Sequence, residues 1–182
     1  MFQVRIHGRG GQGVVTAAEL LSVAAFLDGE HAQAFPSFGS ERTGAPVVAF
    51  CRIDDREIRV REPIVAPDAL IIQDPTLLQQ VDVFGGLRPD GRVLLNSTRT
   101  AAELGLGGMN VICVPAGDLA REHLGKPLPN AALLGAFAAV TGVVTLDAVA
   151  AAIRERFATA PAEANVKAAE AAFALVGEAS HA

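Results

Sequence analysis

A glycine-rich stretch near the amino terminus carries the clearest chemical signal in the sequence. It reads His7-Gly8-Arg9-Gly10-Gly11-Gln12-Gly13, between a strand-like and a helix-like segment. Glycines let an anion reach the backbone, and a helix that starts here offers free N–H groups and the positive end of its dipole. The spacing G-x-G-x-x-G in this context, with the cationic Arg9, predicts contact with a phosphate or pyrophosphate. The alternative is that the glycines only allow a strand and a helix to pack closely.

The segment Phe35–Pro46 is a second candidate for ligand contact. It contains two prolines, two glycines, two serines and an adjacent Glu–Arg pair. A polar loop between rigid elements is where binding residues tend to lie. Its candidate side chains are Ser40 and Arg42. The alternative is a polar connection in which Arg42 pairs with a surface acid.

Two asparagines at the ends of predicted elements complete the candidate set. Asn96 lies at the C-terminal end of a predicted strand over residues 92–97, where ligands gather in open α/β sheets. Asn130 precedes a predicted helix over residues 131–140 and resembles its N-cap. His7 could also face a ligand beside the glycines, although a lone histidine is more often structural.

The sequence shows no group of residues suited to bond breaking. There is no Ser–His–Asp order, no carboxylate pair in a plausible loop, no Cys–His pattern and no metal-ligand spacing among the four histidines. Cys51 and Cys113 form no CxxC motif, so we expect no ferredoxin-type iron–sulfur cluster in this chain. We therefore predict binding residues, with neither a catalytic residue nor a metal ligand.

The elements that must position these residues alternate along the first part of the chain. Apolar residues alternate over 2–6, as in a half-buried strand, and small and apolar residues then run to Leu27, as in a helix. A short strand over 32–35 follows. It ends without the acidic residue that holds the ribose of NAD, so ordinary NAD binding is disfavoured.

Further strands and then helices follow. Residues 46–53 and 57–60 predict a β-hairpin, and Asp74 before Pro75 favours a helix over 75–81. The remaining predicted strands are 69–74, 92–97 and 111–115, and the remaining predicted helices are 118–124, 131–140, 147–157 and 162–176. We predict an α/β fold: a Rossmann-like open sheet, mostly parallel with a β-hairpin, helices on both faces and a helical C-terminal part. With 182 residues and no long linker, we expect a single domain over residues 1–182.

Composition excludes several classes of protein. The net charge of −5 argues against general nucleic-acid binding. The longest uncharged apolar stretch, 131–146, is too short for a membrane span, and arginines and glycines near the amino terminus argue against a signal peptide. Both cysteines lie in apolar, strand-like runs, which predicts two buried thiols in a cytoplasmic protein.

Four motifs, in this order, resemble the gamma subunit of 2-oxoacid:ferredoxin oxidoreductases. They are Gly8–Ala17, Phe35–Val47, Asn130–Ala136 and Asn165–Ala172, and the resemblance covers essentially the whole chain. The amino-acid sequence of the second motif is more similar to that of the pyruvate and 2-oxoisovalerate (branched-chain) members than to that of the 2-oxoglutarate or indolepyruvate members. Many relatives have a second arginine where this chain has Thr43.

The resemblance implies a role in a larger enzyme. Enzymes of this family decarboxylate a 2-oxoacid on thiamine diphosphate, pass electrons through iron–sulfur clusters to ferredoxin and transfer the acyl group to coenzyme A. The gamma part is a Rossmann-like domain that helps to bind coenzyme A and is not active alone. Thiamine diphosphate, magnesium and the clusters belong to partners, the alpha, beta and ferredoxin-like delta subunits.

The resemblance also implies roles for the candidate residues. The backbone of Gly8, Arg9, Gly10, Gly11, Gln12 and Gly13 is expected to contact the phosphates of coenzyme A. Arg42, with Ser40, is expected to meet a phosphate or to line a subunit interface, and Asn96 and Asn130 are expected to complete the pocket. Two other readings stay open: a free-standing Rossmann-type nucleotide-binding protein, and a purely structural subunit.

Overall fold

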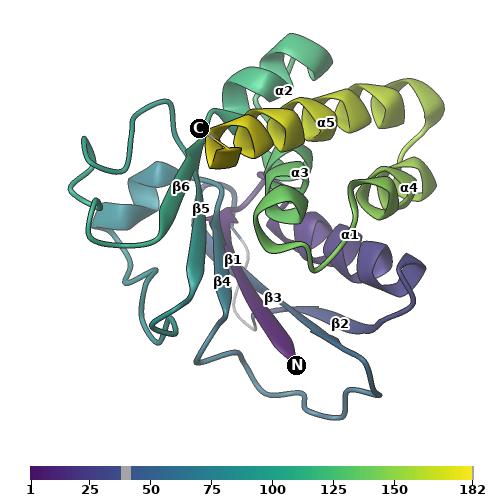
Figure 1. The fold of residues 1–182 in the computed structure, drawn as a ribbon, viewed down its shortest axis with the longest axis horizontal. Helices are drawn as coiled ribbons and strands as arrows, with labels where there is room; N and C mark the ends of the chain where they lie inside the picture. Colours follow the sequence, from purple (N-terminus) through teal and green to yellow (C-terminus); the bar gives the residue numbers. More distant parts are fainter. Residues whose placement is uncertain (38–41, 182) are drawn as a thin grey trace.

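Six strands form one sheet in the order β2-β3-β1-β4-β5-β6 (Figure 1). The computed structural model describes residues 1–37 and 42–181. The strands are β1 (Phe2–Arg9), β2 (His31–Pro36), β3 (Pro46–Asp54), β4 (Ala69–Ile72), β5 (Arg92–Asn96) and β6 (Val111–Val114). The pairs β1–β4, β4–β5 and β5–β6 are parallel, whereas β3 is antiparallel to both β1 and β2. The predicted α/β fold with a mostly parallel sheet is therefore confirmed.

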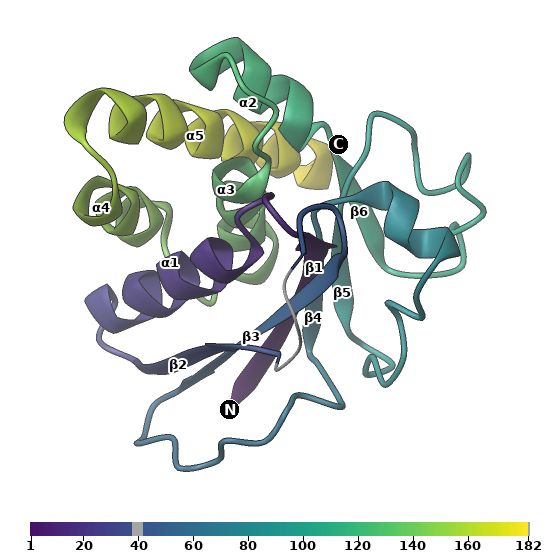
Figure 2. The same ribbon diagram turned by 180° about the vertical axis from the view of Figure 1, so that it is seen from behind.

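The α-helices pack together on one face of this sheet (Figures 1 and 2). They are α1 (Val14–Leu27), α2 (Ala116–Leu124), α3 (Asn130–Thr141), α4 (Leu146–Arg156) and α5 (Thr159–His181). Helix α3 is the centre of this layer, because every residue from Asn130 to Ala138 is buried. This explains why its sequence is apolar on all sides rather than amphipathic. The helical C-terminal part predicted from the sequence is confirmed.

The opposite face of the sheet is covered by shorter elements. A smaller core forms there around Leu70, Ile72, Val93 and Leu95, under the 3-10 helix η1 (Pro75–Gln79) and the neighbouring loops. Helices were expected on both faces of the sheet. Among the described residues, this face carries only the 3-10 helix η1. The β4–β5 connection contains two prolines and three glycines, and the β5–β6 connection contains three glycines; these residues disfavour an α-helix.

The predicted hairpin between 46–53 and 57–60 is wrong. Strand β3 instead pairs with β2 on one side and with β1 on the other. Both of its edges are therefore occupied, so residues 57–60 cannot pair with β3, and they form no strand. Strands β2 and β3 are instead antiparallel neighbours, and their connection lies within the second motif.

Helix starts differ from the sequence predictions in two places. Asp74 caps η1 by accepting the N–H of Thr76, but the helix is 3-10 and ends at Gln79 rather than at residue 81. Pro129 occupies the N-cap position of α3, so Asn130 is the first helical residue instead of the cap. No helix among residues 1–37 and 42–181 is long and apolar enough to cross a membrane.

Candidate anion-binding site at the start of helix α1

The glycine-rich loop joins β1 to α1 and ends in a left-handed glycine. Gly13 is the N-cap of α1 with φ 70°, and Gly11 has φ 91°. Both φ values lie where residues with a side chain are strained, so the loop requires glycine at these positions. The first N–H groups of α1 have no acceptor within the helix, and its first turn carries no acidic side chain. The loop therefore presents donors and a positive dipole end.

A cavity of about 200 Å3 lies against this helix start. Its lining consists of loop residues, the first turn of α1 and one residue of β3: Arg9, Gly10, Gly11, Gly13, Val14, Val15, Thr16 and Val47. Pockets for drug-sized ligands measure about 300–1,000 Å3. This cavity therefore suits a phosphate group or pyrophosphate and not a whole nucleotide.

The second motif packs directly against the first. The N–H of Gly10 donates to the carbonyl of Ala45 over 2.9 Å, and the N–H of Gly44 donates to the carbonyl of Gly10 over 3.1 Å. A Cβ atom at position 10 would lie 2.9 Å from the carbonyl carbon of Arg42, so only glycine allows this approach. Arg42 is exposed beside the loop. Ser40, the other candidate of this motif, lies outside the described residues.

Arg9 spans from the glycine loop to η1. Its Nε lies 3.2 Å from Asp74 Oδ2, its Nη2 donates to Thr76 Oγ1 and Gln80 Oε1 over 2.8 and 2.7 Å, and its Nη1 donates to the Gly44 carbonyl over 3.0 Å. Strands β1 and β4 are neighbours whose connections leave on opposite faces of the sheet, and open α/β sheets bind ligands at such a point. The side chain of Arg9 fills this point, where the carboxylate of Asp74 balances its charge.

Asp74 is the acidic partner in this arrangement. Burial alone would raise the pKa of its carboxyl, but hydrogen bonds from Thr76 and Gln12 and the charge of Arg9 outweigh burial and lower that pKa. The carboxylate therefore stays ionised and holds Arg9 in place.

Gln12 shapes the loop through both ends of its amide. Its Oε1 accepts the N–H of Arg9 over 2.8 Å, and its Nε2 donates to Asp74 Oδ2 over 2.8 Å. Its backbone carbonyl accepts Nε2 of Gln73, again over 2.8 Å. Gln73 is 1% exposed, and its Oε1 is the single buried side-chain oxygen or nitrogen without a hydrogen-bond partner within 1–37 and 42–181. Gln73 was not among the predicted site residues; the only local signal for it is a polar residue directly after a buried strand.

The two candidate asparagines have different surroundings. Asn130 is 7% exposed, and a Cβ at Gly13 would lie 2.7 Å from its Nδ2, so the third motif reaches the glycine loop. The Nδ2 of Asn96 instead donates to the carbonyl of Gln73, and its Oδ1 accepts the N–H of Gly117, both over 3.0 Å. Asn96 thus joins the end of β4 to α2 and does not line the cavity.

His7 has a structural place on the other face of β1. It is 6% exposed, and its Nε2 accepts Nε of Arg5 over 3.0 Å. Burial, followed by the nearby charge of Arg5, lowers the pKa of His7 to about 4. The imidazole is therefore neutral near pH 7 and is held away from the cavity beside α1.

The described residues bring together donors for an anion. In the part of the chain that the structure covers, no three His, Cys, Asp or Glu side chains gather as metal ligands would. Cys51 is buried as predicted, whereas Cys113 is only half-buried because it lies on the edge strand β6. What the geometry provides at the start of α1 is a small cavity beside free backbone N–H groups.

Comparison with known proteins identifies the family. The sequence model of the pyruvate ferredoxin/flavodoxin oxidoreductase family matches residues 3–175 of this chain. Pyruvate synthase subunit PorC of Methanocaldococcus jannaschii is 49% identical over 173 residues, which cover 95% of this chain and 96% of the relative. The pyruvate/ketoisovalerate oxidoreductases common subunit gamma of Thermococcus kodakarensis is 49% identical over 177 residues, with coverage of 95% and 96%.

A solved structure agrees with these sequence relatives. The crystal structure of pyruvate oxidoreductase subunit PORC from Thermotoga maritima matches with a TM-score of 0.84 at 35% identity, over 95% of each chain. Fold, motifs and full-length similarity all lead to one conclusion. The chain belongs to the pyruvate ferredoxin/flavodoxin oxidoreductase family.

Proposed function

We propose that this chain is the gamma subunit of a 2-oxoacid:ferredoxin oxidoreductase that converts pyruvate or a related 2-oxoacid to the acyl-coenzyme A. The sequence relatives are named as subunits of pyruvate synthase and of pyruvate/ketoisovalerate oxidoreductases, and they match almost end to end. In this proposal residues 1–182 act as a single domain that has no activity alone. The chain contributes to coenzyme A binding and to assembly of the complex.

The observation that carries the coenzyme A assignment is the anion site at the start of α1. Backbone N–H groups and the left-handed Gly13 meet at a cavity of phosphate size, and the amide of Asn130 lies against Gly13 outside the cavity lining. Coenzyme A has a pyrophosphate and a ribose phosphate, and helix starts bind such groups well. The volume of about 200 Å3 accommodates only a phosphate part of the molecule, so the rest of coenzyme A contacts other surfaces.

The candidate residues divide into two roles in this proposal. The backbone of Gly8–Gly13 and the side chains of Asn130, Arg42 and Ser40 contact the phosphate or the neighbouring subunit. Arg9, Gln12 and Asn96 make hydrogen bonds that fix the loop and the adjacent strand ends.

The partners and cofactors follow from the family. We propose alpha, beta and ferredoxin-like delta subunits that hold thiamine diphosphate, magnesium and iron–sulfur clusters, with ferredoxin as the electron acceptor. The clusters and thiamine supply the redox chemistry and decarboxylation, and this chain orients the acyl acceptor. Two unpaired cysteines are typical of a reducing compartment, which supports a cytoplasmic complex.

A tagged pull-down of this chain from its native cells, followed by mass spectrometry, tests the proposal. We expect a thiamine-dependent subunit and a cluster-bearing subunit to co-purify, and the preparation to oxidise a 2-oxoacid only when coenzyme A is present. Recovery of the chain alone, as a homo-oligomer, would favour a free-standing nucleotide-binding protein. If a complex is recovered but its affinity for coenzyme A is the same after substitutions in the glycine-rich loop, a purely structural subunit is favoured.

A further inference from the structure

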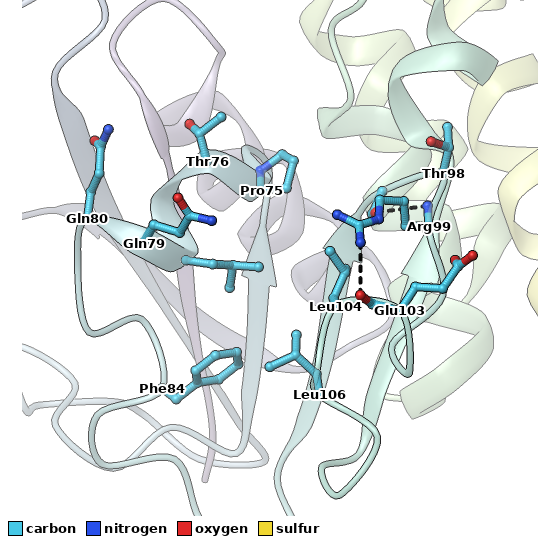
Figure 3. A pocket seen from close by; sticks show the side chains of 12 residues that line it. Pro75, Thr76, Gln79, Gln80, Phe84, Thr98, Arg99, Glu103, Leu104 and Leu106 are labelled. Carbon is cyan, nitrogen blue, oxygen red and sulfur yellow. Dashed lines mark hydrogen bonds between the residues drawn. The ribbon is translucent and has the colours of Figure 1, made fainter.

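A larger cleft lies on the face of the sheet that η1 covers. It encloses about 1020 Å3 between η1 and the loop that follows β5 (Figure 3). Its floor is apolar: Leu78 and Phe84 come from one wall, and Leu104 and Leu106 come from the other. All four side chains are half-buried and pack against the smaller core. We call this space the η1 cleft.

The η1 cleft lies where the sheet has its weakest cover. On the other face, five α-helices cover the sheet, whereas here a short 3-10 helix and glycine-containing loops leave the core partly open. Apolar side chains that stay half-exposed in a group mark an interaction site more often than single exposed residues do.

Arg99 gives the η1 cleft a positive charge. Figure 3 shows its guanidinium on the cleft side of the wall, with the amide of Gln79 on the opposite wall. Its Nη2 donates to the backbone carbonyl of Glu103 over 2.9 Å, and Arg99 forms no ion pair with the carboxylates that the structure describes. The carboxylate of Glu103 points away from the cleft and accepts the N–H of Thr100 over 2.7 Å. The cleft lining therefore carries the charges of both Arg99 and Glu103, and the guanidinium is the charge that faces the cleft.

We propose that the η1 cleft docks a polypeptide segment of a partner subunit, one that places a carboxylate beside Arg99 and an apolar side chain on the floor. An apolar centre with a polar rim is the usual anatomy of a protein interface, and arginine and aromatic residues often dominate its binding energy. This inference rests on the proposed function, because it requires a complex.

Docking in the η1 cleft would also bear on the anion site. Thr76 lines the cleft and accepts Nη2 of Arg9 over 2.8 Å, so one hydroxyl connects the two places. A segment seated here holds η1 against the glycine loop. Partner docking and coenzyme A binding are therefore coupled through η1.

Charge reversal in the assembled complex tests the docking site. Tagged chains that carry Arg99→Glu, Arg99→Lys or Arg56→Glu are expressed in the native cells in place of the wild type. Arg56 is an exposed arginine with 85% of its side chain accessible, far from η1 in the chain, and serves as the matched control. We expect Arg99→Glu to reduce the co-purified partner by about tenfold or more, as loss of a central interface residue does, whereas Arg99→Lys and Arg56→Glu retain it.

A photo-crosslinking residue at position 79 gives a second, independent readout. We expect it to link this chain to a partner segment that contains Asp or Glu, whereas the same residue at position 56 gives no link to that segment. Normal assembly of Arg99→Glu, or no link from position 79 in an intact complex, overturns the docking site. If assembly is normal but the KM of a substrate rises in Arg99→Glu, the cleft holds a small anion instead. A wild-type chain that assembles with nothing contradicts the proposed function itself.

Discussion

Gly10 lies so close to Arg42 that a Cβ on Gly10 would lie 2.9 Å from the carbonyl carbon of Arg42 and 3.3 Å from Cα of Thr43. Two loops more than 30 residues apart in the sequence are thereby joined into one surface beside α1. The candidate anion site depends on this approach, since residues 44 and 45 hold Gly10, which lines the cavity, through backbone hydrogen bonds.

Gly10→Ala should separate the two loops. The methyl group meets backbone atoms that cannot turn aside, so we expect a loss of about 1–3 kcal/mol in the free energy of unfolding and at least about tenfold weaker coenzyme A binding by the complex. Thermal unfolding and calorimetric titration measure the two effects. Gly108→Ala is the control, because a Cβ there meets nothing within 4 Å. Equal coenzyme A affinity of both variants would show that the approach of the loops is unimportant for binding.

Gly135→Ala should destabilise the helical layer. A Cβ on Gly135 would lie 2.6 Å from the carbonyl carbon of Ala169, so α3 and α5 would have to move apart. We expect a loss of about 1–3 kcal/mol or more in a denaturant titration. In Gly177→Ala the new Cβ meets nothing in the structure, so the same exchange in α5 should be neutral or stabilise by up to about 1 kcal/mol. Similar midpoints for the two variants would contradict the close packing of α3 on α5.

His7 should make the chain less stable in mild acid. Its pKa is lowered from 6.5 to about 4 in the folded chain, so the unfolded chain binds more protons between these values. The contribution of neutral His7 to the free energy of unfolding should therefore be fully present above about pH 6.5. The free energy of unfolding should fall, by up to about 3 kcal/mol, as the pH drops toward 4. Unfolding titrations at pH 7, 6 and 5 measure this change. In His7→Gln most of the slope between pH 6.5 and 5 should disappear; an unchanged slope would assign it to other groups.

The two thiols should react at very different rates. Cys51 is 0% exposed and burial raises its pKa to about 12, whereas Cys113 is half-buried and its pKa is raised by burial and by the charge of Glu103. We expect an aromatic disulfide reagent to modify Cys113 slowly in the native chain, and Cys51 only after unfolding. A Cys113→Ala variant that still reacts quickly without denaturant would contradict the burial of Cys51.

Local patterns in the sequence were sufficient for most of the fold. Strand β1, helix α1 and the strands β4, β5 and β6 follow from alternation, apolar runs and turn residues. The failed hairpin at residues 57–60 shows the limit, because strand pairing depends on which edges are free. Whether β3 has a free edge is decided by β1, which lies more than 35 residues earlier.

The candidate site was predictable from the sequence only where its residues are neighbours in the chain. Gly11, Gly13 and the start of α1 are neighbours in the chain, so their motif could be read directly. The partners of Arg9 could not, because Asp74, Thr76 and Gln80 are 65–71 residues away and meet it only across the β1–β4 boundary. Gln73 was missed because its importance comes from burial beneath Gln12, which no local pattern reveals.

The most direct test of the account compares Gly11→Asp with Gly11→Asn in the purified complex. Both variants strain the same left-handed backbone, since Gly11 has φ 91°, and they differ only in charge next to the proposed phosphate. Calorimetric titration with coenzyme A should show at least about tenfold weaker binding for Gly11→Asp than for Gly11→Asn, a difference of about 1.4 kcal/mol or more. Equal affinities in the two complexes would contradict binding of coenzyme A phosphate at the start of α1.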